Sequence, residues 1–323
     1  MEKEFTIVLP DPQILSQVCG TNDSNLRLIE RHLGVSIFTR GNELSISDTS
    51  AEIRQEFKFI IDRLTDELSE NGSDYGADGQ ELVESVLNTG FEKTESENFN
   101  ALDFSISIPG STRKIYPKTK NQARLVEAFR KSTMVFATGP AGCGKTFLAV
   151  AESLRLLLSH RVSSIILVRP IVEAGESLGF LPGDMQDKIN PYLRPLYDSM
   201  SACIPAEMLK KLQENGIIEA VPLAYMRGRT LNNAAVILDE AQNATCGQMK
   251  LFLTRIGENS KVFITGDVTQ IDLPHRIPSG LVQALGILRN IEEISMVELD
   301  SEDVMRSPLV KKIVRAYEND KIE

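Results

Sequence analysis

The sequence contains no tryptophan, three histidines and four cysteines, and aromatic residues make up 6% of its 323 residues. Cys19, Cys143, Cys203 and Cys246 are scattered, without a CxxC pair and without a histidine at zinc-ligand spacing. We therefore expect reduced thiols in a reducing compartment, and neither a metal cluster nor a disulfide framework.

Long apolar runs are also missing. The opening stretch carries acids and no apolar run of signal-peptide length, and no later stretch is long enough to span a bilayer. We expect a cytoplasmic protein. The length predicts two domains, one small and one large enough to bury a substantial core.

The net charge of −10 belongs to one segment. Residues 66–103 hold eleven acidic residues against a single base, Lys93, and the remainder of the chain is neutral. Because the acidity is confined, it neither excludes nor favours a polyanionic partner for the rest of the protein. One hypothesis is that this segment mimics nucleic acid and folds over a basic face as a brake.

Residues 1–69 have the pattern of a small α+β domain. The hydrophobic periodicity predicts a strand, two helices, a two-stranded hairpin and a third helix, in the order β-α-α-β-β-α. That order resembles a type I KH domain, in which a Gly-x-x-Gly loop clamps a single-stranded nucleic-acid backbone. The matching loop is Gly20-Thr-Asn-Asp23, where a carboxylate replaces the second glycine and should repel phosphate. The domain is therefore either a nucleic-acid clamp or a docking domain.

Residues 70–108 are rich in Asn, Gly, Ser and Glu, which predicts an acidic flexible linker interrupted by one short helix around 80–88. From Pro109 to Lys131 the chain becomes basic. This basic stretch opens the predicted second domain, residues 109–323.

A nucleotide-binding motif lies in this second domain. An apolar strand at 134–138 is followed by a Gly-x4-Gly-Lys-Thr loop and then by an apolar helix, which is the setting that a P-loop requires. Glycines let backbone N–H groups point at phosphates, and the helix N-terminus adds partial positive charge. We expect Lys145 to reach the β and γ phosphates and Thr146 to bind Mg²⁺. The predicted nucleotide-binding residues of the loop are Gly139, Pro140, Ala141, Gly142, Cys143, Gly144, Lys145, Thr146 and Phe147.

Two acidic residues follow a second apolar strand, at 235–238. At the carboxyl end of such a strand Asp239 suits the Mg²⁺ shell, and Glu240 can orient and deprotonate water. A glutamate in this role implies hydrolysis, so the pattern disfavours a small-molecule kinase. The alternative is a solvated strand end.

Two glutamines complete the predicted site. Gln270, after a strand at 261–265, is placed to sense the γ-phosphate, as the third motif of superfamily 1 helicases does. A plain loop is the alternative. The stretch from Pro117 to Gln122 resembles the helicase Q motif, in which the glutamine reads adenine, so we expect ATP rather than GTP.

The second domain is predicted to be a parallel sheet with helices on both faces, an α/β core of the helicase-like P-loop type. Helicases of superfamilies 1 and 2 place ATP between two such cores, and this chain has room for one. We therefore expect a homo-oligomer, in the form of a ring. The predicted strands are 134–138, 164–168, 235–238, 261–265 and 294–299.

Several longer motifs lie in the second domain: Arg169–Glu176, Leu178–Asp184, Pro191–Tyr197, Tyr225–Thr230, Asp239–Asn243 and Thr265–Asp272. These motifs resemble those of the PhoH family of ATPases. The likeness runs from about Ile115 to Tyr317, and Asn25–Gly34 is similar to the subgroup whose core follows a KH-like module.

The resemblance implies an ATPase of RNA metabolism, with family members that act beside a small metal-dependent endoribonuclease in ribosome maturation and with hexameric relatives. It also implies that Arg306 acts as a finger on the γ-phosphate, in cis or in trans; a structural salt bridge is the alternative. Four arginines in family motifs are candidates for an RNA path, or else they pin loops to carboxylates. They are Arg169, Arg194, Arg227 and Arg229.

Two functions remain open at this stage. In the first, the protein is an RNA-stimulated ATPase or helicase. In the second, it is an ATP-dependent switch that alters its grip on a protein partner, and the partner binds RNA. The arginine-rich motifs favour the first, and the Gly20–Asp23 loop and the acidic segment favour the second.

Overall fold

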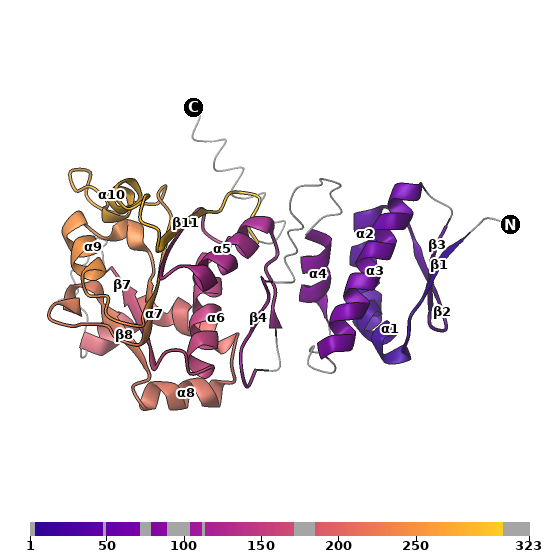
Figure 1. The fold of residues 1–323 in the computed structure, drawn as a ribbon, viewed down its shortest axis with the longest axis horizontal. Helices are drawn as coiled ribbons and strands as arrows, with labels where there is room; N and C mark the ends of the chain where they lie inside the picture. Colours follow the sequence, from indigo (N-terminus) through magenta and orange to yellow (C-terminus); the bar gives the residue numbers. More distant parts are fainter. Residues whose placement is uncertain are drawn as a thin grey trace. The chain divides into compact units, whose positions relative to one another are not determined.

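A computed structural model describes most of the chain (Figure 1). The described residues are 4–47, 50–71, 79–88, 104–111, 114–170 and 185–305. Contacts divide the chain into two compact units, Met1–Ala123 and Arg124–Glu323, which we describe separately. Within the described ranges, no helix combines the length and apolarity that crossing a membrane requires.

The first unit contains the predicted order β-α-α-β-β-α. Its three strands form an antiparallel sheet in the order β1-β3-β2, and buried residues from the helices and the sheet share one hydrophobic core. The side chain of Asp11 accepts a hydrogen bond from the Gln13 N–H (2.7 Å) and so caps the first helix. The elements are β1 (Phe5–Val8), α1 (Pro12–Cys19), α2 (Ser24–Leu33), β2 (Ile37–Arg40), β3 (Glu43–Ile46) and α3 (Ala51–Asn71).

The loop between α1 and α2 has the backbone shape that glycines favour. Gly20 has φ of 72°, and Asn22 and Asp23 have φ of 54° and 58°. Asn and Asp tolerate this left-handed region better than other side chains do. Asp23 therefore adopts a left-handed backbone at the position of the second glycine of a Gly-x-x-Gly loop. Unlike that glycine, it carries a carboxylate at this position.

The helix predicted within the linker is present as α4 (Gln80–Asn88). Leu82, Val83 and Val86 are buried in the same core as α2 and α3. The Ser85 hydroxyl donates to the Pro117 carbonyl (2.8 Å), just before α5 (Lys120–Lys131). A short antiparallel pair, β4 (Ile106–Ser107) and β5 (Lys114–Ile115), lies between these helices in the chain.

The second unit is built on a six-stranded, fully parallel sheet with the order β11-β6-β10-β9-β7-β8. All five predicted strands are present within one residue at each end. The sixth, β8, was not predicted, because Glu219 and Pro222 break its apolar pattern at the edge of the sheet. The strands are β6 (Met134–Thr138), β7 (Ser164–Arg169), β8 (Ile218–Pro222), β9 (Ala234–Leu238), β10 (Lys261–Gly266) and β11 (Ile294–Glu298).

Helices cover both faces of this sheet, as predicted (Figure 1). On one face, Val262 and Ile264 of β10 share a buried cluster with α9 (Cys246–Leu253) and α10 (Gly280–Ile287). On the other face the Phe263 ring lies 4.5 Å from the ring of Phe129 in α5, measured between centroids. That face is also packed by α6 (Lys145–Leu158), and beside it lie α7 (Met185–Ser201) and α8 (Ala206–Glu214).

Candidate nucleotide site

The Gly-rich loop connects β6 to α6. Gly142 and Gly144 both have φ of 86°, and Gly144 is the N-cap of α6. The left-handed glycines turn the chain sharply, so that the N-terminus of a 14-residue helix faces the loop. The loop therefore has the backbone that a phosphate cradle requires.

The segment after β11 packs against this loop. A Cβ on Gly139 would lie 2.3 Å from the carbonyl oxygen of Leu299, and the φ of Gly139 is 140°, so only glycine fits there. The Met305 N–H donates to the Gly142 carbonyl (2.9 Å). Residues 299–305 thus hold the loop in place.

The Lys145 side chain lies within the loop. Its Nζ donates to the carbonyls of Gly139 and Pro140, both at 2.7 Å, and approaches the Cys143 Sγ at 3.5 Å. Lys145 is only 8% exposed and lines the pocket described below. Burial raises the pKa of the Cys143 thiol, and the nearby Lys145 ammonium opposes that rise. Cys143 is therefore a poor thiolate despite its place in the loop.

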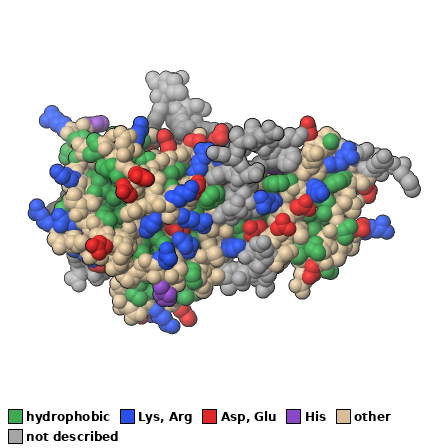
Figure 2. Space-filling view, in the orientation of Figure 1, with side chains coloured by type: hydrophobic (Ala, Val, Ile, Leu, Met, Phe, Trp, Pro, Cys, Tyr) green, Lys and Arg blue, Asp and Glu red, His purple; other side chains and the backbone are tan. Residues whose placement is uncertain are grey.

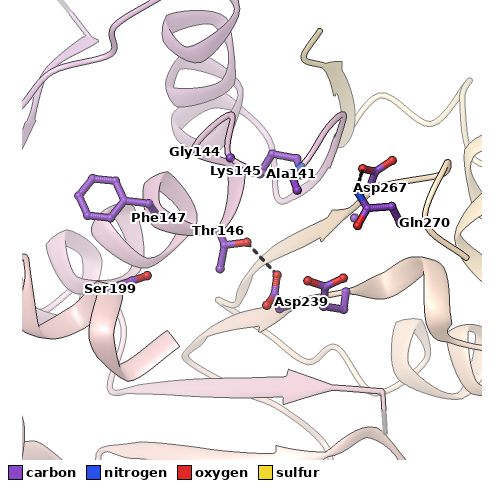
Figure 3. A pocket seen from close by; sticks show the side chains of 12 residues that line it. Ala141, Gly144, Lys145, Thr146, Phe147, Ser199, Asp239, Asp267 and Gln270 are labelled. Carbon is purple, nitrogen blue, oxygen red and sulfur yellow. Dashed lines mark hydrogen bonds between the residues drawn. The ribbon is translucent and has the colours of Figure 1, made fainter. Parts of the chain in front are cut away.

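Asp239 joins the loop to the strand end. Its Oδ1 accepts hydrogen bonds from the Thr146 hydroxyl (2.8 Å) and from the Thr265 hydroxyl (2.7 Å). Figure 3 shows Thr146 and Asp239 facing each other at the pocket. Thr265 reaches Asp239 because β10 lies between β6 and β9 in the sheet. The residues predicted to bind Mg²⁺ therefore meet, although 93 positions separate them in the chain.

Glu240, the next residue, has a left-handed backbone, and each of its carboxylate oxygens contacts a neighbouring side chain. Its φ of 53° is left-handed, which turns the side chain away from the path of β9. Oε1 lies 3.3 Å from the Arg169 Nη2, and Oε2 accepts a hydrogen bond from the Gln242 Nε2 at 2.6 Å. The Glu240 side chain is 40% exposed, against 19% for Arg169.

Gln242 links Glu240 to the loop after β10. It is 1% exposed, and its Oε1 accepts a hydrogen bond from the Asp267 N–H at 3.0 Å. A Cβ on Gly266 would lie 2.9 Å from that oxygen, so glycine makes room for the contact. Asp267 in turn accepts from the Gln270 amide (2.9 Å). A continuous chain of hydrogen bonds therefore runs from Glu240 through Gln242 and Asp267 to Gln270.

A pocket of about 280 Å³ lies at the carboxyl edge of the sheet (Figure 3). Lys145, Thr146, Asp239, Glu240 and Gln270 are all among the residues that line it. The lining residues are Ala141, Gly142, Gly144, Lys145, Thr146, Phe147, Ser199, Asp239, Glu240, Gly266, Asp267 and Gln270.

Of the predicted site residues that the structure describes, Gly139, Pro140, Cys143 and Gln122 are not among those that line the pocket. Gly139 and Pro140 supply the carbonyls that accept from Lys145, and Cys143 is fully buried.

Gln122 lies in the first unit. Its N–H donates to the Thr119 hydroxyl (3.1 Å) and its Oε1 accepts from the Lys118 N–H (2.7 Å), which is a capping arrangement for α5. Arg306 lies outside the described residues, directly after Met305. The adenine and finger roles of these two residues stay predictions.

The four motif arginines divide into two pairs. Arg169 and Arg229 have carboxylate partners: Arg229 makes a two-pronged contact with Glu219, at 2.7 and 2.6 Å. Arg194 on α7 and Arg227 are exposed. Of the four arginines in the family motifs, two thus form ion pairs and two are exposed.

The sequence did not indicate Thr265 or Gln242 as parts of the site. Their contacts depend on the strand order, which a sequence pattern does not contain. The one available signal was their position, because Thr265 is near the end of a predicted strand and Gln242 follows the Asp-Glu pair by two residues.

The residues present fit a nucleotide and Mg²⁺. Hydroxyl and carboxylate oxygens are the ligands that Mg²⁺ prefers. Asp239 is 5% exposed, lines the pocket, and receives no hydrogen bond on Oδ2 from the described residues. Thr146 Oγ1 lies beside the same carboxylate. Across the described ranges no group of three or more His, Cys, Asp or Glu residues forms a separate metal site.

Fold and pocket together define an α/β protein of the P-loop nucleotide-binding class, built on a fully parallel sheet. The family described as "PhoH-like protein" matches residues 114–318. The chain belongs to the PhoH family.

Several curated relatives are similar over nearly the whole chain. The PhoH-like protein of Bacillus subtilis is 45% identical over 314 residues, which cover 96% of each chain. That of Mycobacterium tuberculosis H37Rv is 46% identical over 312 residues, covering 95% of this chain and 85% of the relative. Protein PhoH of Escherichia coli K12 is 44% identical over 208 residues, 64% of this chain and 59% of the relative.

Among solved structures, the helicase nonstructural protein 10 of an arterivirus, in complex with DNA, aligns with 53% of this chain and 37% of that chain. The TM-score is 0.27 and the identity 20%. A likeness this slight carries no argument about function.

Proposed function

We propose that this protein is a Mg²⁺-dependent ATPase that acts in RNA metabolism. The observation that carries the proposal is the meeting of Thr146 and Asp239 at 2.8 Å, with Glu240 lining the same pocket. A phosphate cradle alone would support binding. A cradle with an adjacent carboxylate that can take a proton from water supports hydrolysis.

In the proposed reaction, water attacks the γ-phosphorus, the bond to the β-phosphate oxygen breaks, and Glu240 accepts the proton of the water. Lys145 would leave the loop carbonyls to hold the β and γ phosphates, and the loop N–H groups would hold the remaining oxygens. Thr146 and Asp239 would hold Mg²⁺, which neutralises charge on the phosphate oxygens when it is bound.

Three further residues complete the proposal. Gln270 would detect loss of the γ-phosphate and pass the change to Glu240 through Asp267 and Gln242, along the hydrogen bonds already described. Arg306 would supply positive charge to the transferring phosphate. Gln122 would select adenine.

A polyanionic partner is supported by the charge on α5 and α6. Figure 2 shows Lys and Arg side chains gathered over these helices, and Arg124, Arg130 and Lys131 are exposed. The count is offset in part, because Lys131 pairs with Glu127 (2.5 Å) and Arg155 pairs with Glu152 (2.6 Å). Exposed Arg194 and Arg227 add candidates for phosphate contacts.

The assembly and the protein partner belong to the same proposal. The chain has room for one P-loop core, whereas helicases of superfamilies 1 and 2 place ATP between two. This supports a homo-oligomer in which a neighbouring copy completes the nucleotide site, and the family resemblance favours a hexameric ring. A small metal-dependent endoribonuclease is the proposed partner in ribosomal RNA maturation.

A second candidate function is an ATP-dependent switch that grips a protein partner and does not itself remodel RNA. The observation that favours it is Asp23, a carboxylate held in a left-handed position in the α1–α2 loop. A negative group there weakens the case that this loop clamps a phosphate backbone.

The deciding experiment measures steady-state ATP hydrolysis with and without single-stranded RNA, at two salt concentrations. Glu240→Gln serves as the blank, because it keeps the shape of the side chain and removes the proton acceptor. We expect hydrolysis well above the blank, stimulation by RNA, and a weaker stimulation at high salt, since phosphate contacts are lost as counterions compete.

A wild-type rate equal to that of Glu240→Gln would refute the ATPase proposal. A wild type that hydrolyses ATP and ignores RNA would favour the switch, and the search would move to a protein partner.

A further inference from the structure

We infer that Arg169 restrains Glu240, and that a phosphate of bound RNA relieves the restraint by drawing the guanidinium away. This inference deepens the proposed function, because it names the residue through which RNA would raise the rate of hydrolysis. It assigns Arg169 a positioning role and leaves the catalytic groups unchanged.

The geometry of Glu240 supplies the first step. Both carboxylate oxygens have a partner: Oε1 faces the Arg169 Nη2 at 3.3 Å, and Oε2 accepts from Gln242 at 2.6 Å. An oxygen that accepts a proton from water needs a lone pair directed at that water. Each carboxylate oxygen has two lone-pair sites, so the contact with Arg169 leaves one of them on Oε1. Held between Arg169 and Gln242, however, the carboxylate can turn Oε1 towards that water only when the guanidinium moves.

The two partners of Glu240 differ in how firmly they are fixed. Gln242 is 1% exposed, and its other amide atom and its backbone carbonyl are hydrogen-bonded to Asp267 and Ser279. Arg169 comes from a different strand, β7, and besides the ion pair it makes one hydrogen bond among the described residues, from Nη1 to the Tyr192 carbonyl on α7. Gln242 is therefore a fixed support, whereas Arg169 can exchange partners at the cost of two contacts.

The chemistry of Arg169 indicates what draws it away. A guanidinium presents a planar fork that matches phosphate as well as carboxylate, and the contact with Glu240 is longer than the 2.6 and 2.7 Å of the Arg229–Glu219 pair. Arg194, exposed on the same helix as Tyr192, adds a second positive group for a polyanion near that helix. The phosphate groups of an RNA backbone are therefore suitable partners for Arg169 and Arg194.

The alternative is that the Arg169–Glu240 ion pair has only a structural role and connects β7 to the end of β9. The main-chain ladder between these strands already joins them from Ser164–Ala234 to Val168–Leu238. The ion pair lies beyond the last of those pairings, and its Glu240 end lines the pocket, where a purely structural tie adds little. The two alternatives differ in sign, because loss of a tie lowers the rate and loss of a restraint raises it.

The test compares Arg169→Ala and Arg169→Gln with wild type. Arg169→Gln keeps a donor for the Tyr192 carbonyl and guards against a folding defect in the alanine variant, which melting curves would reveal. Arg289→Ala is the matched control, since Arg289 is an exposed arginine between α10 and β11, at the opposite edge of the sheet. Each protein is assayed for kcat and KM for ATP, with and without oligouridylate.

We expect Arg169→Ala and Arg169→Gln to raise the basal kcat roughly fivefold, the factor that corresponds to ~1 kcal/mol, the upper end for a partly exposed ion pair. KM for ATP should be unchanged, because Arg169 holds Glu240 and not the nucleotide. Oligouridylate should add little further stimulation. Arg289→Ala should behave as wild type.

A folded Arg169→Gln whose kcat falls towards that of Glu240→Gln would overturn the inference, as would a raised kcat that RNA still stimulates by the wild-type factor. A wild type that hydrolyses ATP without responding to oligouridylate also overturns it, and leaves the ATPase proposal intact. Hydrolysis no faster than the Glu240→Gln blank would instead remove the proposed function itself.

Discussion

Two hydroxyl groups donate to the same carboxylate oxygen, and they offer a matched pair of substitutions. Thr146 lies 2.8 Å and Thr265 lies 2.7 Å from the Oδ1 of Asp239. Valine has the shape of threonine without the hydroxyl, so Thr146→Val and Thr265→Val each remove one hydrogen bond to a buried carboxylate. Only Thr146 belongs to the proposed Mg²⁺ site.

The structure sets the expected cost. A hydrogen bond to a charged group contributes about 1.5–3 kcal/mol to the free energy of unfolding. For a unit of this size, each kcal/mol lowers Tm by roughly 2–4 °C, so both variants should melt about 3–12 °C below wild type without ligand. Because the two distances are nearly equal, the two shifts should be similar, with Thr265→Val at the upper end since Thr265 is fully buried.

Ligand should separate the variants. A ligand at about 100 times its Kd stabilises the folded state by ~2.7 kcal/mol. In thermal melts with Mg²⁺ and ADP, Thr265→Val should keep this gain, because Thr146 still orients Asp239 and the other carboxylate oxygen is untouched. Thr146→Val should lose most of it at the same concentration. Equal ligand-induced shifts in the two variants would refute the assignment of Thr146 to the metal.

The remaining predictions concern charge and thiol chemistry. The Arg229 guanidinium holds the pKa of Glu219 below its usual range, so this pair stabilises the fold above the ordinary glutamate pKa of about 4.3 and loses that contribution as pH falls through the lower folded value. Arg229→Ala should therefore lower the midpoint of urea unfolding more at pH 7 than at pH 3; an equal loss at both would show that packing, and not charge, is responsible. Cys143 is fully buried with a raised pKa, so iodoacetamide at pH 7.5 should label Cys246, which is partly exposed, well before Cys143. Peptide mass spectrometry of the native protein measures the order, and early labelling of Cys143 would contradict the packing of the loop.

Short apolar strands bounded by turn residues could be predicted closely from the sequence. β6 and β9 carry few polar residues, and the loops after them have the special residues that mark a nucleotide site. β8 could not be found in the same way, because an edge strand tolerates a charged residue and a proline that a central strand would not.

The candidate site divides along a similar line. Local motifs are enough to predict Lys145, Thr146, Asp239 and Glu240, because each of these residues belongs to a short contiguous stretch of sequence. Contacts between motifs depend on which strands are neighbours, and no local pattern states that β10 lies between β6 and β9. Gln122 shows the reverse difficulty, because a glutamine three residues after a threonine is also what caps a helix.

The segment at 299–305 affects how the nucleotide-binding unit can be cut out of the chain. A fragment ending at Glu298 would keep all six strands and every residue of the Gly-rich loop. It would lack the Leu299 carbonyl that packs on Gly139 and the Met305 N–H that binds the Gly142 carbonyl. The Gly-rich loop would then keep its sequence and lose the segment that packs against it. The smallest fragment able to hold the loop in this conformation therefore extends past the last strand by at least seven residues.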